Sequence, residues 1–283
     1  MRLILTLSCR DRAGIVHAVS GFLFEHGGNI LEAAQFEDTT TGRFFMRVAF
    51  EIGDGSRPMA AQIEDRFAPL ATRFGMQAYF REAQRRLPTI IMVSKLGHCL
   101  NDLLFRWRSG LLPIDVRGIV SNHRDFEPLA ASYGIQFHHI PVASGSKLRA
   151  EERLVEVFET KGAELLVLAR YMQILSDDLC RQLRGRAINI HHSFLPSFKG
   201  ARPYQQAHEL GVKLIGATAH YVTPELDEGP IIEQDVARSS HSMDAAALAA
   251  LGRDVESAVL ARAVCWHAEH RILLNGSKTV VFH

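Results

Sequence analysis

Hydrophobic and polar positions along residues 2–81 follow the period of a strand in some segments and the period of a helix in others. The predicted strands are residues 2–8, 29–37, 42–51 and 76–81, and residues 42–51 alternate most clearly. The predicted helices carry Ile15, Val19, Phe22 and Leu23, and then Met59, Ile63, Phe67, Leu70 and Phe74. Glycines end both helices. The order βαββαβ predicts a ferredoxin-like unit over residues 1–83.

A polar, basic segment, residues 84–88, follows this unit, ends at Pro88 and reads as a linker. From residue 89 to 283, short apolar runs alternate with helical segments, which predicts βαβ units and a mostly parallel sheet. The predicted strands here are residues 89–94, 116–121, 135–142, 164–169, 187–192, 213–223 and 230–237. Ser176 is a predicted N-cap, and residues 243–274 are predicted to form a terminal helix. The chain is therefore predicted to be an α/β protein with two domains.

Charge and cysteine usage narrow the class of function. Lys and Arg number 32 and Asp and Glu number 31, so no net field draws the chain to nucleic acid or to an anionic membrane. The four cysteines form no CxxC pair, which argues against a zinc ribbon, a redox motif or a disulfide framework. No apolar run approaches the ~18 residues of a membrane span, and the first apolar run is too short for a signal peptide. These features predict a cytoplasmic protein.

Candidate chemistry lies where the strand at 187–192 ends, in the stretch INIHHSFLPSF. Asn189 and His191 share one face of this strand, and ligands of parallel sheets gather beyond the carboxyl ends of the strands. An amide N–H and a protonated imidazole can stabilise the negative oxygen of a carbonyl under attack, and a carboxylate can orient the imidazole. Asp227, in the turn-rich loop TPELDEGP, can supply it. On spacing alone, the alternative is that these residues cap a strand and shape a turn.

A metal site is the rival interpretation of His191, His192 and His220 near Asp227. Neighbouring strand residues face opposite ways and no HExxH or CxxC pattern is present, so we predict no metal, and we expect His192 to be a packed or hydrogen-bonded residue at the strand end. The turn after the first strand of the second domain, VSKLGHCLNDLL, has the single glycine Gly97, which argues against strong phosphate binding there. Lys95 and His98 remain candidates for holding a carboxylate or for facing solvent.

In the first domain, the loop of CRDRAGIVHAVSGFLFEHGGNI joins a strand to a helix and contains Gly14. This loop either simply turns the chain or forms a small-molecule site.

Three segments, NIHHSFLPSFKGARPYQQA, GATAHYVTPELDEGPIIEQD and LARYMQIL, resemble the formyltetrahydrofolate-dependent formyltransferase family, and most closely its deformylase branch. The N-terminal unit with DRAGIV and GGNI resembles an ACT domain, and the resemblance reaches the closing GSKTVVF. It implies a Rossmann-like formyltransferase domain behind an ACT domain. It also implies hydrolysis of 10-formyltetrahydrofolate to formate and tetrahydrofolate, which supplies formate for purine synthesis and balances one-carbon pools. The folate is the substrate, and no cofactor is implied.

The resemblance also assigns residues. Asn189 and His191 match the family's N-x-H motif, and His220 with Asp227 matches its H-x6-D motif, so Asn189, His191 and Asp227 are the implied catalytic residues. The implied substrate-binding residues are Tyr171, Met172, Gln173, Ile174, Leu175 and Val222. An amino-acid effector is implied at the ACT domain, near Asp11, Arg12, Gly14 and Asn29. A homo-oligomer is implied because ACT-like units commonly pair, and no nucleic acid or membrane partner is expected.

Two departures concern the acceptor of the formyl group. The related glycinamide ribonucleotide transformylases have a glycine-rich phosphate turn after the first strand and a proline after the catalytic histidine. This chain has SKLGHC and His192 at those places, as in the deformylase branch, whose acceptor is water. Two alternatives remain: formyl transfer to an amine, and a folate-binding, amino-acid-sensing regulatory protein without turnover.

Overall fold

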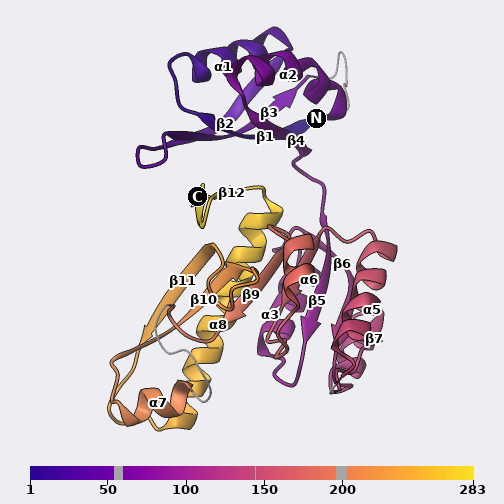
Figure 1. Ribbon diagram of the computed structural model, residues 1–283, viewed down its shortest axis with the longest axis vertical. Helices are drawn as coiled ribbons and strands as arrows, with labels where there is room; N and C mark the ends of the chain where they lie inside the picture. Colours follow the sequence, from indigo (N-terminus) through magenta and orange to yellow (C-terminus); the bar gives the residue numbers. More distant parts are fainter. Residues whose placement is uncertain (54–59, 144, 196–202) are drawn as a thin grey trace. The chain divides into compact units, whose positions relative to one another are not determined.

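A computed structural model describes residues 1–53, 60–143, 145–195 and 203–283, which form two compact units (Figure 1). The first unit comprises Met1–Arg85, Glu269–Asn275 and Val280–His283, and the second comprises Arg86–Ala268 and Gly276–Thr279. Within these described ranges, none of the helices has both the length and the apolar character needed to cross a bilayer.

The first unit confirms the predicted βαββαβ order. Its elements are β1 (Arg2–Arg10), α1 (Ile15–Glu25), β2 (Gly28–Asp38), β3 (Arg43–Ile52), α2 (Ala60–Phe74) and β4 (Gln77–Glu82). The strands form an antiparallel sheet in the order β2-β3-β1-β4. Alternate apolar residues of β1 and β3 pack against Phe22 and Phe67 of the two helices, whose rings meet edge to face at 5.0 Å. Met59, the expected start of the second helix, lies outside the described residues.

The second unit is a mostly parallel sheet with helices. Its elements are β5 (Leu87–Val93), α3 (His98–Arg108), β6 (Ile114–Ser121), α4 (Glu127–Ser132), β7 (Phe137–His139), α5 (Lys147–Thr160), β8 (Leu165–Leu168), α6 (Asp177–Gln182), β9 (Ala187–His191), α7 (Pro203–Glu209), β10 (Leu214–Tyr221), β11 (Ile231–Arg238) and α8 (Ala245–Ala268). The described strands run in the order β11-β10-β9-β8-β5-β6-β7. The five neighbours β9, β8, β5, β6 and β7 are parallel to one another, whereas β10 and β11 are added antiparallel at the β9 edge. The predicted fold class is confirmed.

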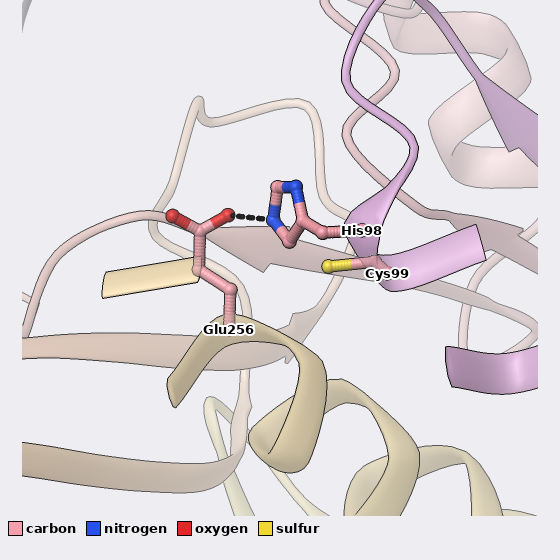
Figure 2. A group of neighbouring side chains, drawn as sticks. All are labelled: His98, Cys99 and Glu256. Carbon is pink, nitrogen blue, oxygen red and sulfur yellow. Dashed lines mark hydrogen bonds and ion pairs between the residues drawn. The ribbon is translucent and has the colours of Figure 1, made fainter. Parts of the chain in front are cut away.

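Two groups of helices sandwich this sheet. Residues of α5 and α6 pack with β5 and β8 in one apolar cluster, whereas α8 contacts β9, β10, β11 and α3 (Figure 1). Where α3 and α8 meet, His98 Nε2 lies 2.8 Å from Glu256 Oε2 (Figure 2). The sheet order reverses between β5 and β8, so a crevice is expected beyond their carboxyl ends.

The C-terminal segment differs from the prediction. The terminal helix α8 ends at Ala268 rather than at residue 274, and the hairpin of β12 (Ile272–Asn275) and β13 (Lys278–Val281) follows. The turn is made possible by Gly276, whose φ of 64° suits glycine.

Of the residues after α8, Glu269–Asn275 and Val280–His283 group with the first unit, although the sequence assigned residues 89–283 to one domain. Polar contacts with the first sheet explain this grouping. The Glu269 carbonyl accepts a hydrogen bond from Arg47 at 3.2 Å, and Arg271 donates to Glu32 at 3.3 Å. The side chain of Asn275 donates to Asp38 at 2.6 Å.

Candidate active site

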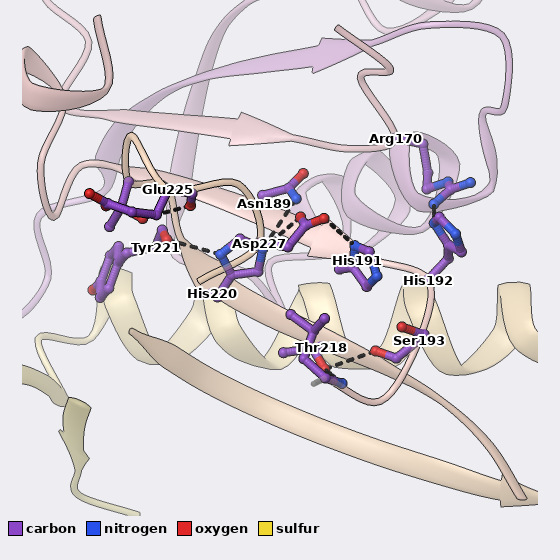
Figure 3. A network of polar contacts seen from close by, with 12 residues as sticks. Arg170, Asn189, His191, His192, Ser193, Thr218, His220, Tyr221, Glu225 and Asp227 are labelled. Atoms are coloured by element: carbon purple, nitrogen blue, oxygen red, sulfur yellow. Dashed lines mark hydrogen bonds and ion pairs between the residues drawn. The ribbon is translucent and has the colours of Figure 1, made fainter. Parts of the chain in front are cut away.

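The candidate catalytic residues lie on β9 and in the loop that follows β10, and their neighbour His220 lies on β10 (Figure 3). Asn189 pairs with His220 across the antiparallel strands, and His191 pairs with Thr218. The Asn189 Nδ2 atom lies 3.3 Å from His220 Nε2, and His220 Nδ1 donates to the Tyr221 carbonyl at 2.9 Å. The Asn189 amide has two N–H groups and only one of them can be directed at His220, so at least one remains for a ligand.

Asp227 completes the cluster from the loop between β10 and β11. Its Oδ2 lies 3.2 Å from His191 Nδ1, and its Oδ1 lies 3.6 Å from His220 Nε2. The backbone of Asp227 has a φ of 57°, a conformation that Asp and Asn tolerate better than most residues. Gly229 is needed in the same loop, because a Cβ there would lie 1.7 Å from the Tyr221 carbonyl oxygen. Local backbone geometry thus turns the carboxylate toward both imidazoles.

Burial and hydrogen bonding act in opposite directions on Asp227. Burial alone would raise the pKa of its carboxyl group, but hydrogen bonds from His191 and His220, together with their charge, hold the pKa well below its usual range. Asp227 is therefore an anion throughout the physiological pH range. It can fix the Nδ1–H of His191 and compensate a positive charge on that ring.

His191 lines a cavity, and its second ring nitrogen is not engaged by Asp227. The residue is only 7% exposed, and its Nε2 has no hydrogen-bond partner among the described residues. The turn that follows is fixed by Thr218, whose hydroxyl donates to the Ser193 carbonyl at 2.9 Å and accepts from the Leu195 N–H at 3.1 Å. Residues 196–202 of the predicted motif lie outside the described residues.

A cavity of about 260 Å³, open to solvent, adjoins the cluster. Its lining includes the implied catalytic residues Asn189, His191 and Asp227 and the implied substrate-binding residues Tyr171, Met172, Gln173, Ile174, Leu175 and Val222. The segment after β8 is tied to the end of β5 by Ser94, whose hydroxyl accepts from the Met172 N–H at 3.0 Å. The structure thus brings all of these predicted residues to one site.

The cavity suits a flat heteroaromatic ring with a polar end. Met172, Ile174 and Leu226 leave large apolar surfaces exposed at the cavity, with 57%, 60% and 57% of each residue accessible. Tyr171 and Gln173 add polar groups, and burial, followed by the charge of Glu151, raises the pKa of Tyr171 to about 12. Apolar walls with a few placed polar groups are typical of small-molecule sites.

A buried ionic network lies beside the cluster. Its acidic residue, Glu256, and its basic residue, Arg170, were not identified from the sequence. Glu256 is 1% exposed and accepts from Tyr204 at 2.6 Å, while its Oε2 contacts His98 at 2.8 Å and Arg170 Nε at 3.3 Å. Burial would raise the pKa of Glu256, but these partners lower it. The sequence did contain a signal for this buried acid, because Glu256 lies within the buried stripe of α8 formed by Leu248, Gly252, Val259 and Leu260.

This network also contains three potential metal ligands, His98, Cys99 and Glu256, whose ligand atoms lie within 4.8 Å of one another (Figure 2). Both carboxylate oxygens of Glu256 already have partners, and one of the partners is the guanidinium of Arg170. Burial raises the pKa of the Cys99 thiol far above its usual value. The carboxylate is therefore neutralised by the protein's own cation, and the cluster is poorly suited to a metal ion.

His192 gives the folded protein a specific pH dependence. Burial, followed by the charges of Arg170 and His191, lowers the pKa of His192 to about 4. An unfolded histidine has a pKa of about 6.5, so the unfolded state binds more protons between these two values. We expect the melting temperature to fall as the pH is lowered from 7 to 5, and the fall to be smaller by at least about 2 °C in His192→Gln.

Thermal unfolding followed by circular dichroism at several pH values measures this difference. The shifted carboxyl groups Asp227 and Glu256 lose their contribution only at lower pH, because their folded pKa values lie below the ordinary ones. The exposed His241 supplies the control His241→Gln, which should keep the wild-type slope. Equal slopes in all three proteins would contradict the expectation.

The first unit has its own open hollow, of about 540 Å³, at the loop between β1 and α1. Asp11, Arg12 and Gly14 line it, as do Gln35 and Glu37 of β2, whereas Asn29 is not among the lining residues. Asn29 instead donates to Glu51 at 3.4 Å. Gly14 has a φ of 91° and begins helix α1.

The fold and the site define a class of protein. Residues 88–264 match the formyl transferase family, and residues 3–66 match the ACT domain. The parallel sheet, with an Asn, a His and an Asp beyond its carboxyl ends, is thus a formyl-transferase-type domain that follows an ACT domain.

Full-length relatives identify the branch. The formyltetrahydrofolate deformylase of Corynebacterium sp. (strain P-1) is 52% identical over 281 residues, or 99% of this chain and 98% of the relative. The crystal structure of formyltetrahydrofolate deformylase from Burkholderia mallei ATCC 23344 is 53% identical, with a TM-score of 0.95 over 100% of this chain and 99% of that one. Glycinamide ribonucleotide transformylase 1 from Symbiobacterium toebii is 28% identical, with a TM-score of 0.67 over 72% of this chain and 97% of that one. This chain belongs to the formyltetrahydrofolate deformylase family.

Proposed function

We propose that this chain hydrolyses 10-formyltetrahydrofolate to formate and tetrahydrofolate, a reaction of one-carbon metabolism. The observation that carries the proposal is the cluster of Asn189, His191 and Asp227 beside a cavity with apolar walls. Identity above 50% with deformylases over the whole chain supports water as the acceptor. The formate released is then available for purine synthesis, and the enzyme balances the one-carbon pools.

The first chemical step is attack of water on the formyl carbon. As the new C–O bond forms, negative charge develops on the formyl oxygen, where the free N–H of Asn189 and the Nε2–H of a protonated His191 donate hydrogen bonds. Asp227 holds the opposite side of the imidazole at 3.2 Å and compensates its charge. One proton of the attacking water passes to the Asp227 carboxylate or to solvent.

The second step is collapse of the tetrahedral intermediate. The C–N10 bond breaks, its electron pair goes to N10, and His191 supplies the proton that N10 then binds. The products are tetrahydrofolate and formic acid, which ionises to formate. Every step uses side chains of this chain and the water molecule.

The proposal predicts formate release from 10-formyltetrahydrofolate by the purified protein in plain buffer. Formate and tetrahydrofolate should appear in equal amounts, and added glycinamide ribonucleotide should not change the rate. Formylated amine in place of formate would instead establish a transferase. Tight folate binding without either product would favour the regulatory interpretation.

We propose that the first unit binds a small amino acid near Asp11, Arg12, Gly14 and Asn29, at an interface between paired ACT domains of a homo-oligomer. The carboxylate of Asp11 and the guanidinium of Arg12 line the hollow at the start of α1 and match the two charges of a zwitterion. The match of residues 3–66 to the ACT domain supports an effector role. A cytoplasmic location is also proposed, because four scattered cysteines without a CxxC pair suit a reducing compartment.

This effector proposal predicts heat on titration of the protein with one of the common amino acids, and a loss of at least about tenfold in affinity in Gly14→Val, equivalent to ~1.4 kcal/mol. Valine at a φ of 91° distorts the loop. The control is Gly75→Val, because Gly75 has a similar φ of 63° but does not line the hollow. Titrations without heat for any amino acid would reject the proposal.

A further inference from the structure

His192 and the ionic network behind it are not used by the mechanism above. His192 Nδ1 lies 2.8 Å from Arg170 Nη1, and Arg170 Nε lies 3.3 Å from Glu256 Oε2 (Figure 3). Arg170 and Glu256 are 8% and 1% exposed, so this chain of contacts is largely shielded from water. Buried ion pairs are costly to assemble, and their placement beside a catalytic cluster calls for a role.

The chemistry of arginine fixes the tautomer of His192. A guanidinium has only donors, so the Nδ1 of His192 must accept the hydrogen bond and cannot carry a proton. The ring is then neutral with its proton on Nε2. The lowering of the pKa of His192 to about 4 agrees with this assignment.

Arg170 is held in place from several sides. Its backbone has a φ of 65°, which is rare for a residue with a side chain, and its carbonyl accepts from the Ser94 N–H at 3.3 Å. Glu256, which pairs with its guanidinium, is itself fixed by Tyr204 and His98. The network therefore fixes the direction of the hydrogen bond to His192.

The Nε2–H of His192 is a hydrogen-bond donor without an acceptor among the described residues. This atom is buried and has no partner among the described residues, although buried polar groups are nearly always paired with protein or water. The ring stacks on His191, with centroids 4.8 Å apart and planes at 21°, and it lines the same cavity as Asn189 and Asp227. Because His192 lines the cavity, a molecule bound there is the candidate acceptor.

We propose that His192 positions the attacking water, by donating its Nε2–H to the water oxygen while the Arg170–Glu256 pair fixes the required tautomer. This inference rests on the proposed hydrolysis. The oxygen of water has two lone pairs. One accepts from His192, and the other forms the bond to the formyl carbon. The proton balance of the reaction is unchanged, because His192 keeps its proton throughout.

Two substitutions separate this role from packing. His192→Gln keeps an N–H donor at the position of Nε2, whereas His192→Phe keeps an aromatic ring against His191 and has no donor. Hydroxylamine is the second acceptor: it displaces tetrahydrofolate from the formyl carbon and gives formohydroxamate. Because hydroxylamine does not depend on the water position, the ratio of formohydroxamate to formate reports on water positioning.

We expect His192→Phe to lower the rate of formate release about 10- to 100-fold, with an unchanged KM for 10-formyltetrahydrofolate and a hydroxamate-to-formate ratio raised about tenfold or more. His192→Gln should recover much of the formate rate and return the ratio toward that of the wild type. Glu256→Gln, which preserves side-chain shape but weakens the hold on Arg170, should raise the ratio in the same direction. The exposed His241 provides the control His241→Phe, which should leave both products unchanged.

Three results would overturn the inference: a wild-type rate in His192→Phe, a parallel loss of both products, or equal losses in the Phe and Gln variants. If His192→Phe does not fold, the ratio measured for Glu256→Gln decides, and an unchanged ratio there rejects the water-positioning role. A wild-type protein that releases no formate would overturn the hydrolysis itself and this inference with it. Formate release by the wild type, with an unchanged ratio in the variants, rejects only the role of His192.

Discussion

Replacing Asp227 with Asn is expected to lower kcat for formate release by about 100- to 10,000-fold, with little change in KM. The substitution keeps the shape of the side chain and suits the φ of 57° at this position. It removes the negative charge that faces His191 Nδ1 at 3.2 Å, so the imidazole loses both its fixed tautomer and the compensation of its positive charge. Steady-state rates of formate release at saturating folate measure the loss.

A matched control lies in the same loop. Glu225→Gln removes the same charge from an exposed residue two positions earlier, and it should leave kcat unchanged. Folate binding should survive in Asp227→Asn, because the cavity walls formed by residues 171–175 are not altered. A wild-type rate in Asp227→Asn would remove Asp227 from the mechanism.

The sequence predicted that the candidate catalytic residues lie near one strand end, and the structure brings them together there. The alternation of β9 predicted that Asn189 and His191 share a face, the turn-rich loop TPELDEGP offered Asp227, and the family resemblance implied the same three residues. The positive φ of Asp227 and the close approach at Gly229, which together aim the carboxylate, have no sequence signal that hydrophobic periodicity can detect. The sequence therefore named the candidate residues, and the structure adds how they are arranged.

The ionic network could not be predicted from the pattern of the sequence. The members of this network are far apart in the sequence. His98 and Glu256 lie in helices α3 and α8 and Arg170 follows β8, and none of them forms a motif with its sequence neighbours. They meet only because α3 and α8 pack on the same face of the sheet and β8 ends beside them. His98 was expected to hold a carboxylate or to face solvent, and the carboxylate that it binds is the protein's own Glu256.

The C-terminal hairpin was missed for a different reason. Hydrophobic residues continue through residues 272–274, so the apolar pattern of α8 had no obvious end, although Asn275 and Gly276 form a dipeptide typical of hairpins. Its grouping with the first unit depends on polar contacts of Glu269, Arg271 and Asn275, which a search for apolar faces does not reveal. Long-range polar pairing was thus the least predictable feature of this fold.

Replacing His191 with Ala is expected to lower kcat by about 100- to 10,000-fold, because one side chain supplies both the oxyanion donor and the proton for N10. The Nδ1 of this ring is held by Asp227, and its Nε2 has no partner among the described residues. Alanine removes the Nε2–H that the mechanism uses, together with the rest of the ring. The decisive measurement is the double variant with Asp227→Asn. Since Asp227 acts through His191, the second substitution should add less than about tenfold to the loss. Fully multiplicative losses would show that Asp227 acts separately, directly on the attacking water.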